Sequence, residues 1–249
     1  MAQRRRSPLT IPSADPHACT VDVRMRVLGS VPYFADLSAE ELADVNARAD
    51  VRAFDEGAPI YHAGAAAMQL YVVATGTVKL TRVNADGQET LLDLLIPGDH
   101  LGSLPALGNR VYPDSAWALT PACLLVFGTR DFDSVLHRHR AVALATLGVV
   151  ADQLADTRDH VHDLSSVSVD RVLAATLLRL ADRVGEPWEE PGLLLQVPLT
   201  REDLAGMTGA RPETVSRILS TWRRDGLITT GRRWIAILDR STLETKAEA

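Results

Sequence analysis

Apolar and polar residues alternate in short runs through the first half of the chain. Between residues 54 and 101, runs such as LYVVATGTVKLTRV and TLLDLLIPGD place apolar residues at alternate positions, Val78 and Leu80 among them. Asp-Gly and Pro-Gly pairs interrupt these runs. Alternation with a period of two, broken by turn residues, is typical of short antiparallel strands. Strand character returns over residues 115–127, so the pattern predicts a compact β-roll or jelly roll.

After residue 140 the spacing of apolar residues lengthens to three and four. This spacing predicts a long helix over residues 141–165, with a narrow apolar seam of the kind that pairs two parallel helices. Packing of the seam against the β-roll of the same chain is the alternative, because about three heptads is near the minimum for a coiled coil. We favour a homodimer through Leu144, Leu147, Ala151, Leu154, Arg158 and Val161, of which Arg158 is the charged member.

The last third of the chain predicts a winged helix-turn-helix. After a helix that ends at Gly185, EPWEEPG indicates a loop and LLLQVPL a strand. A helix over residues 200–209 begins with the capping pair Thr200 and Asp203, and a turn at Gly209 leads to a second helix over residues 212–224. Pro212 suits the first turn of that helix, because its missing N–H would have no partner there. GLITTGRRWIAIL then indicates two short strands whose tip carries two arginines.

Together these segments predict an α+β fold in four parts. They are a flexible N-terminal arm (1–27), a β-roll sensor domain (28–140), a dimerisation helix (141–165) and a winged helix-turn-helix domain (166–245), which a chain of 249 residues is long enough to form. The opening segment lacks the apolar run of a signal peptide, and the most apolar window is about half the ~20 residues of a membrane helix. We therefore expect a cytoplasmic protein.

One face of the helix over residues 212–224 is polar. Glu213, Ser216 and Arg217 share this face at three- and four-residue spacing, opposite an apolar stripe that includes Val215 and Trp222. In a major groove an arginine can bind guanine O6 and N7, and a carboxylate can accept from cytosine N4. The alternative is a solvated helix in which Glu213 and Arg217 form a structural ion pair.

Charge is distributed unevenly along the chain. The formal net charge is -6, which argues against a protein that coats nucleic acid with its whole surface. Residues 211–233 nevertheless hold six arginines and two acidic residues. This local excess of positive charge would attract phosphate. Candidate phosphate contacts are Thr200, Arg201, Arg211, Thr214, Arg232 and Arg233.

The chain resembles the CRP/FNR superfamily of bacterial transcription regulators in two separate stretches. The superfamily's helix-turn-helix is similar to LTREDLAGMTGARPETVSRILSTWRRDGLI, and its cyclic-nucleotide-binding-like β-roll is similar to FDEGAPIYHAGAAAMQLYVVATGTVKL with IPGDHLGS. By this similarity, Glu213, Ser216 and Arg217 look like the FNR-type reading set. The resemblance implies a homodimer on double-stranded DNA with TTGA-type half-sites, and a contact with RNA polymerase. No catalytic constellation is evident in the sequence.

The resemblance also indicates where a signal would bind. Nucleotide-binding members present a glutamate after a G-D-x-x-G turn, and an arginine before Ser-Ala. Here Ser103 replaces the glutamate and Asp114 replaces the arginine, and a carboxylate repels a phosphate. The sequence therefore disfavours cyclic AMP, while haem or another small ligand stays open. The corresponding pocket residues are Leu101, Gly102, Ser103, Asp114, Ser115 and Ala116.

The chain has two cysteines, Cys19 and Cys123, which are too few for a disulfide framework. They fall near two of the four cysteines that hold the iron–sulfur cluster of the FNR branch, with His17 as a further candidate ligand. A cluster normally takes four thiolates, so the sequence disfavours one here. We expect Cys19 to be an exposed thiol of the arm and Cys123 to be a buried apolar residue. A switch between the two thiols, or a redox or metal-dependent thiol protein, is the alternative function.

Overall fold

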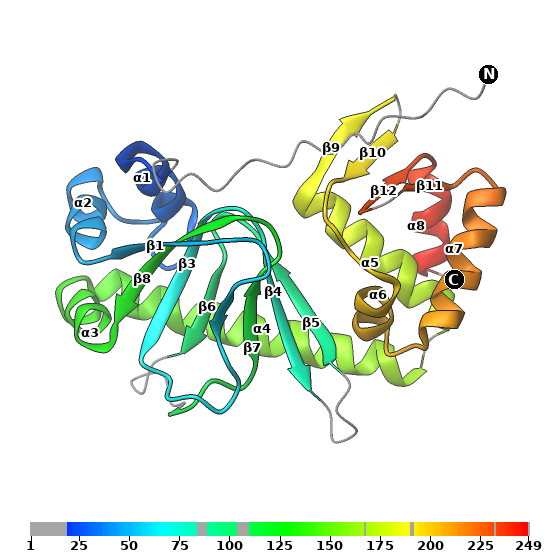
Figure 1. Cartoon of the computed structure of the whole chain (residues 1–249). Helices are drawn as coiled ribbons and strands as arrows, with labels where there is room; N and C mark the ends of the chain where they lie inside the picture. The colour runs from blue at the N-terminus through cyan, green and yellow to red at the C-terminus, as the bar shows by residue number, and fades with distance from the viewer. Residues whose placement is uncertain are drawn as a thin grey trace. The chain divides into compact units, whose positions relative to one another are not determined.

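The computed structural model describes residues 19–83, 89–103, 110–166, 168–189, 192–231 and 233–248. The described chain forms an N-terminal unit, mainly residues 19–159, and a C-terminal unit from residue 160 onward. Figure 1 labels their helices and strands. The predicted α+β class is confirmed, because strands dominate the first unit and helices alternate with short strands in the second. In the described part of the chain, no helix is long and apolar enough to cross a membrane.

Two four-stranded sheets form the β-roll of the N-terminal unit (Figure 1). One sheet has the order β1-β8-β3-β6 and the other has the order β2-β7-β4-β5. The strands are β1 (Asp50–Phe54), β2 (Pro59–Tyr61), β3 (Gln69–Thr75), β4 (Val78–Val83), β5 (Glu89–Leu95), β6 (His100–Ser103), β7 (Ser115–Ala118) and β8 (Ala122–Gly128).

Strand β3 lies between two hydrophobic clusters. Leu70 and Val72 point to one face of the sheet, where helices cover it, while Tyr71 and Val73 point to the interior of the β-roll. Successive side chains of a strand point to opposite faces, so a strand covered on both faces is apolar throughout. Because β3 and β8 are covered on both faces, almost all of their residues are buried.

In the described part of the chain, the N-terminal unit contains α1 (Val21–Ser30), α2 (Ala39–Ala47), α3 (Thr129–Arg138) and, up to Asp159, α4 (Arg140–Ser166). Thr20 caps α1, and Ser38 with Glu41 forms a capping box at the start of α2. Residues 21–27 were assigned to a flexible arm, but they are helical. Val27 and Leu28 of α1 are buried in the cluster beneath the sheet, and this burial stabilises the helix.

The C-terminal unit contains helices α5 (Val169–Val184), α6 (Arg201–Thr208), α7 (Pro212–Arg224) and α8 (Arg240–Glu248). Its sheet has the order β11-β12-β10-β9, formed by β9 (Gly185–Trp188), β10 (Gly192–Leu195), β11 (Ile228–Gly231) and β12 (Trp234–Ile237). The two strands predicted at the wing are confirmed as β11 and β12. The prediction of a loop directly after Gly185 is wrong, because that segment pairs with β10 as the edge strand β9.

Local signals in the sequence determine the helix-turn-helix. The Thr200 hydroxyl accepts from the Asp203 N–H and the Asp203 carboxylate accepts from the Thr200 N–H, so the predicted capping box is confirmed. Gly209 ends α6 with φ of 61°, a left-handed conformation that favours glycine. Pro212 occupies the first turn of α7, and Arg211 stands at its N-cap without a side-chain hydrogen bond.

Candidate nucleic-acid interface

Helix α7 has one buried face and one exposed face. Val215, Leu219 and Trp222 are buried, and Trp222 is among the largest side chains that are fully buried. Burying these three apolar side chains against the rest of the unit contributes several kcal/mol, at about 1.5–3 kcal/mol each. This packing holds the helix in one rotational setting, so the opposite face points outward.

The three predicted reading residues lie on that outward face. Glu213 and Arg217 are exposed and Ser216 is half-buried. Within the described residues, neither the Glu213 carboxylate nor the Arg217 guanidinium has a hydrogen bond or an ion pair. The structural Glu213–Arg217 pair that the sequence left open is therefore not formed. Ser220, further along the same face, donates its hydroxyl to the Ser216 carbonyl at 2.7 Å.

Arginines flank the reading face. Arg211 is exposed at the N-cap of α7, where the orphan N–H groups and the helix dipole also favour an anion. Burial lowers the pKa of Arg201 from its ordinary value, and the positive charge of Arg223 lowers it further. These two guanidinium groups are close enough to repel each other, and a phosphate bound near them would offset that repulsion.

The other predicted phosphate contacts differ in availability. Thr200 donates both its N–H and its hydroxyl to Asp203 at 2.8 Å, so its donors are occupied within the protein. Thr214 is half-buried in the first turn of α7. Arg233 is half-buried at the β11–β12 turn, with φ of 71°. Arg232 lies outside the described residues.

Helix α4 carries an apolar stripe that the N-terminal unit leaves exposed. Leu144, Leu147 and Leu154 are 59%, 68% and 50% exposed, and Ala151 and Arg158 are exposed beside them. Val142 and Thr146 are buried on the opposite side of the helix. The described part of the seam is therefore free of the packing against the β-roll that was the alternative. Val150, 50% exposed at the edge of the stripe, was missed, and the side chain of Val161 lies outside the described residues.

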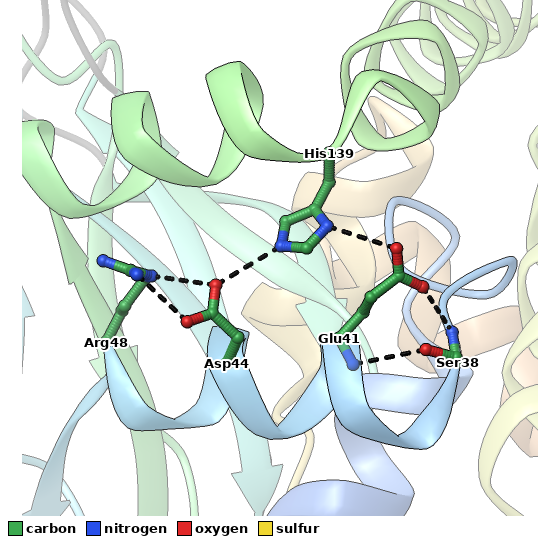
Figure 2. Close-up of polar contacts among 5 residues, drawn as sticks. All are labelled: Ser38, Glu41, Asp44, Arg48 and His139. Atoms are coloured by element: carbon green, nitrogen blue, oxygen red, sulfur yellow. Dashed lines mark hydrogen bonds and ion pairs between the residues drawn. The ribbon is translucent and has the colours of Figure 1, made fainter.

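The start of α4 is attached to α2 by a polar cluster. Figure 2 shows the His139 ring between two carboxylates, with Nδ1 3.5 Å from Glu41 and Nε2 3.4 Å from Asp44. Arg48 donates to both oxygens of Asp44 at 3.0 and 3.2 Å. Hydrogen bonds from Ser38 lower the pKa of Glu41 and the hydrogen bond from Arg48 lowers that of Asp44, with His139 lowering both further. Both carboxylates therefore stay charged toward His139.

Tyrosines fill the interior of the β-roll beside the predicted sensor residues. The rings of Tyr61 and Tyr112 stack with their centroids 4.0 Å apart. A side-chain carbon built on Gly102 would lie 3.0 Å from the Tyr71 ring, so this ring packs directly on the backbone there. Leu101, Ser103 and Ala116 are buried in the same region.

Asp114 faces this group of tyrosines. The Tyr61 hydroxyl donates to its carboxylate at 2.9 Å, and burial raises the pKa of Asp114 from its ordinary value. The adjacent Ser115 hydroxyl accepts from the Ala63 N–H at 2.9 Å. The sensor residues thus already have partners within the β-roll.

The two cysteines form a disulfide bond, with their Cα atoms 6.4 Å apart. Cys123 is buried, as predicted, but the expectation that Cys19 is an exposed thiol is wrong. Cys19 is 7% exposed and belongs to the cluster beneath the sheet, where apolar side chains of α1 and β8 surround it. The sequence left a switch between these two thiols open, and the disulfide brings them together. His17 lies outside the described residues, among which no group of three or more metal-binding side chains occurs.

The fold and the exposed face of α7 define a DNA-binding regulator with a β-roll sensor domain. Residues 173–246 match the family model of a Crp-like helix-turn-helix domain, and residues 51–139 match that of a cyclic nucleotide-binding domain. The chain belongs to the CRP/FNR family of transcription regulators.

Two relatives and one solved structure illustrate the similarity. The transcriptional regulator LdrP of Thermus thermophilus is 30% identical over 189 residues, which cover 76% of this chain and 92% of that protein. The cyclic AMP receptor protein of Thermus thermophilus is 28% identical over 213 residues, covering 86% and 95% respectively. The structure of FixK2 from Bradyrhizobium japonicum has a TM-score of 0.71 at 23% identity, covering 81% of this chain and 98% of that one.

The family of the β-roll implies a cyclic nucleotide, but the residues of this chain do not fit one. Asp114 stands at the position expected to hold the phosphate, and its carboxylate would repel that group. Tyr61 and Tyr112 stack beside it, and Tyr71 packs on Gly102. A phosphate bound there would replace the Tyr61 hydrogen bond and face the half-buried Asp114 carboxylate, which is costly even though Arg82 attracts that carboxylate.

Proposed function

We propose that this protein is a homodimeric regulator that reads a palindrome of TTGA-type half-sites and responds to a signal other than cyclic AMP. Helix α7 of each copy enters the major groove, with Glu213, Ser216 and Arg217 as the base-reading residues. Arg201, Arg211, Thr214 and Arg233 contact phosphates, with Arg232 as a further candidate. By its family membership, the protein acts together with RNA polymerase.

The observation that carries the proposal is the outward face of α7. A buried carboxylate or guanidinium normally has a partner, and an exposed pair at four-residue spacing on a helix often forms one. Glu213 and Arg217 instead have none among the described residues. Both groups project from the exposed face of a helix whose opposite face is packed, so both are available to a ligand outside the protein. Unpaired polar groups on such a face suit base recognition.

The stripe on α4 supports the homodimer. Exposed leucines in a row with three- and four-residue spacing are unfavourable in water and become buried when two copies of the helix pair. Pairing about a two-fold axis would present two copies of α7 to one duplex, and successive major grooves on one face of DNA lie about 34 Å apart. The proposed palindrome follows from that symmetry.

The replacement Arg217→Ala tests the proposal. Binding to a fluorescent duplex with a TTGA inverted repeat, and to a scrambled duplex of the same composition, is measured by anisotropy. A bidentate arginine–guanine contact gives about 1–3 kcal/mol of discrimination, so losing two contacts per dimer should reduce the preference about 30-fold or more. Arg130→Ala, which removes an exposed arginine from α3, is the matched control and should keep the wild-type preference. An undiminished preference in the Arg217 variant would refute the assignment.

A further inference from the structure

The disulfide between Cys19 and Cys123 connects two distant parts of the N-terminal unit. Cys19 directly precedes the N-cap of α1, and Cys123 lies in β8, 104 residues later. A protein that binds chromosomal DNA works among cellular thiols, where lasting structural disulfides are rare and most disulfides are transient. The bond is therefore better explained as a redox site than as a permanent cross-link.

Apolar contacts hold the segment that this bond attaches, and two unpaired polar atoms oppose its docking. Within the described residues, two buried side-chain atoms lack a hydrogen-bond partner, namely Arg24 Nε on α1 and Asn46 Oδ1 on α2. A buried polar atom without a partner opposes the docked state, because in water it would be hydrated. Buried apolar side chains of α1, of α2 and of the segment between them act in the other direction, with Leu28, Phe34 and Val45 fully buried. A covalent bond at the start of α1 can shift such a balance.

His139 connects α1 and α2 to the dimerisation helix α4. Helix α1 packs on α2 and on β3. From α2, Glu41 and Asp44 hold the two ring nitrogens of His139 (Figure 2). His139 links α3 to α4, because its N–H donates to the Val135 carbonyl at 2.9 Å and its carbonyl accepts from the Val142 N–H at 3.0 Å. Loosening α1 and α2 would thus release the start of α4.

We propose that Cys19 and Cys123 form a redox switch in which the disulfide form binds DNA tightly and the dithiol form binds weakly. The proposal rests on the proposed function and names its signal. In the disulfide form α1 and α2 are held against the sheet, His139 fixes the start of α4, and the paired helices set the spacing of the two α7 helices. The dithiol form loses that fixed spacing.

The chemistry needs one oxidant and one reductant, and both are common classes. A peroxide accepts the attack of one thiolate, which gives a sulfenic acid and releases water or an alcohol; the second thiol then displaces water and forms the disulfide. A dithiol reductant reverses the reaction, since its thiolate attacks one sulfur and its second thiol resolves the mixed disulfide. Both cysteines are buried, so exchange requires opening of the first turn of α1, where Thr20 and Val21 are exposed.

Anisotropy of the full chain on the TTGA duplex and the scrambled duplex tests the switch. Dithiothreitol should weaken binding to the TTGA duplex about tenfold, a usual size for coupling between sites, and hydrogen peroxide should restore it. Cys19→Ala with Cys123→Ala should bind at the reduced level and ignore both reagents, because the chain has no other cysteine. His139→Gln, which keeps both cysteines, should lower the affinity of the oxidised form and shrink the redox response.

Each result separates the switch from the proposed function. Equal affinity of the oxidised and reduced chains, with the TTGA preference intact in both, would overturn the switch and leave the proposed function standing. Loss of the TTGA preference in both forms would overturn the proposed function, and the switch with it. Tighter binding by the reduced chain would overturn the direction assigned here and the route through α1 and α2. A response to dithiothreitol that persists in the double variant would also exclude the cysteine pair.

Discussion

Leu147→Ala should weaken dimerisation strongly. Leu147 is 68% exposed on α4 and lies in the middle of the stripe that Leu144, Ala151 and Leu154 continue. The side chain makes little contact within its own unit, so truncation should leave the fold of the monomer intact. Its contribution appears only when a second copy of α4 covers it.

The size of the effect follows from the exposed area. Burying a leucine side chain fully contributes about 1.5–3 kcal/mol, and roughly two thirds of this one is available for burial, which gives about 1–2 kcal/mol per copy. A symmetric dimer loses two copies, or about 2–4 kcal/mol. Since about 1.4 kcal/mol changes an equilibrium constant tenfold, the dissociation constant should rise about 30-fold to about 700-fold.

Sedimentation equilibrium over a range of protein concentrations measures this constant directly. Met68→Ala is the matched control, because Met68 is also apolar and 56% exposed but lies outside α4, just before β3. The control should keep the wild-type dissociation constant, and circular dichroism should show the same helix content in all three proteins. A Leu147 variant that dimerises as tightly as the wild type would refute the role of the stripe and leave the symmetric reading of DNA without its basis.

Two further predictions concern α1 and the segment between α1 and α2, where Tyr33 contacts His100 of β6. Burial lowers the pKa of His100, which is hydrogen-bonded to the Tyr33 hydroxyl, from 6.5 to about 4. The unfolded chain therefore binds this proton at a higher pH than the folded chain does, so the unfolding free energy should fall by up to about 3 kcal/mol as the pH drops from 6.5 to about 4. Urea unfolding midpoints of His100→Asn should vary less with pH than those of the wild type. The same pH dependence in both proteins would contradict this. Arg24→Met removes a buried unpaired atom that opposes docking of α1, so the affinities measured by anisotropy with and without dithiothreitol should differ less than in the wild type. An unchanged ratio would show that this atom does not affect the docking of α1.

The reading helix could be predicted from the sequence because its determinants are local. Pro212 at the first turn, the left-handed turn at Gly209 and the alternation of Val215 and Trp222 with polar residues all act within a few residues. Each of these features restricts the backbone or the direction of a side chain independently of the rest of the chain. The sequence therefore predicted both the helix bounds and its outward face.

The missed elements depend on partners elsewhere in the chain. Gly185–Trp188 contains a proline and a glutamate, which favour a loop, but as an edge strand β9 uses β10 for its pairing and tolerates Pro187. Val21–Ser30 has weak amphipathic character of its own, and α1 forms where Val27 and Leu28 are buried against β3. Packing of this kind outweighs local propensity.

The β-roll was the least predictable part of the chain, because its side-chain contacts also join residues that are far apart in the sequence. Cys19 meets Cys123 across 104 residues of sequence, and Tyr61 meets Asp114 across 53. The sequence identified Asp114 as a departure from the family pattern and Cys123 as a position near a family cysteine, but the partner of each is set by the fold. The sequence thus singled out these two positions, and the folded chain shows which side chains meet there.

The two units differ in how completely their buried polar groups are satisfied, and this difference indicates where the molecule can change. Among the described residues, both buried side-chain atoms without a partner lie on α1 and α2, and the helix-turn-helix contains none. The packed helix-turn-helix can keep the same face of α7 outward while the position of the unit changes. Under the proposed switch α1 instead has a docked and a loosened state, and the covalent bond at Cys19 selects between them. We therefore expect redox changes to alter the spacing of the two reading helices and to leave the sequence that each helix prefers unchanged.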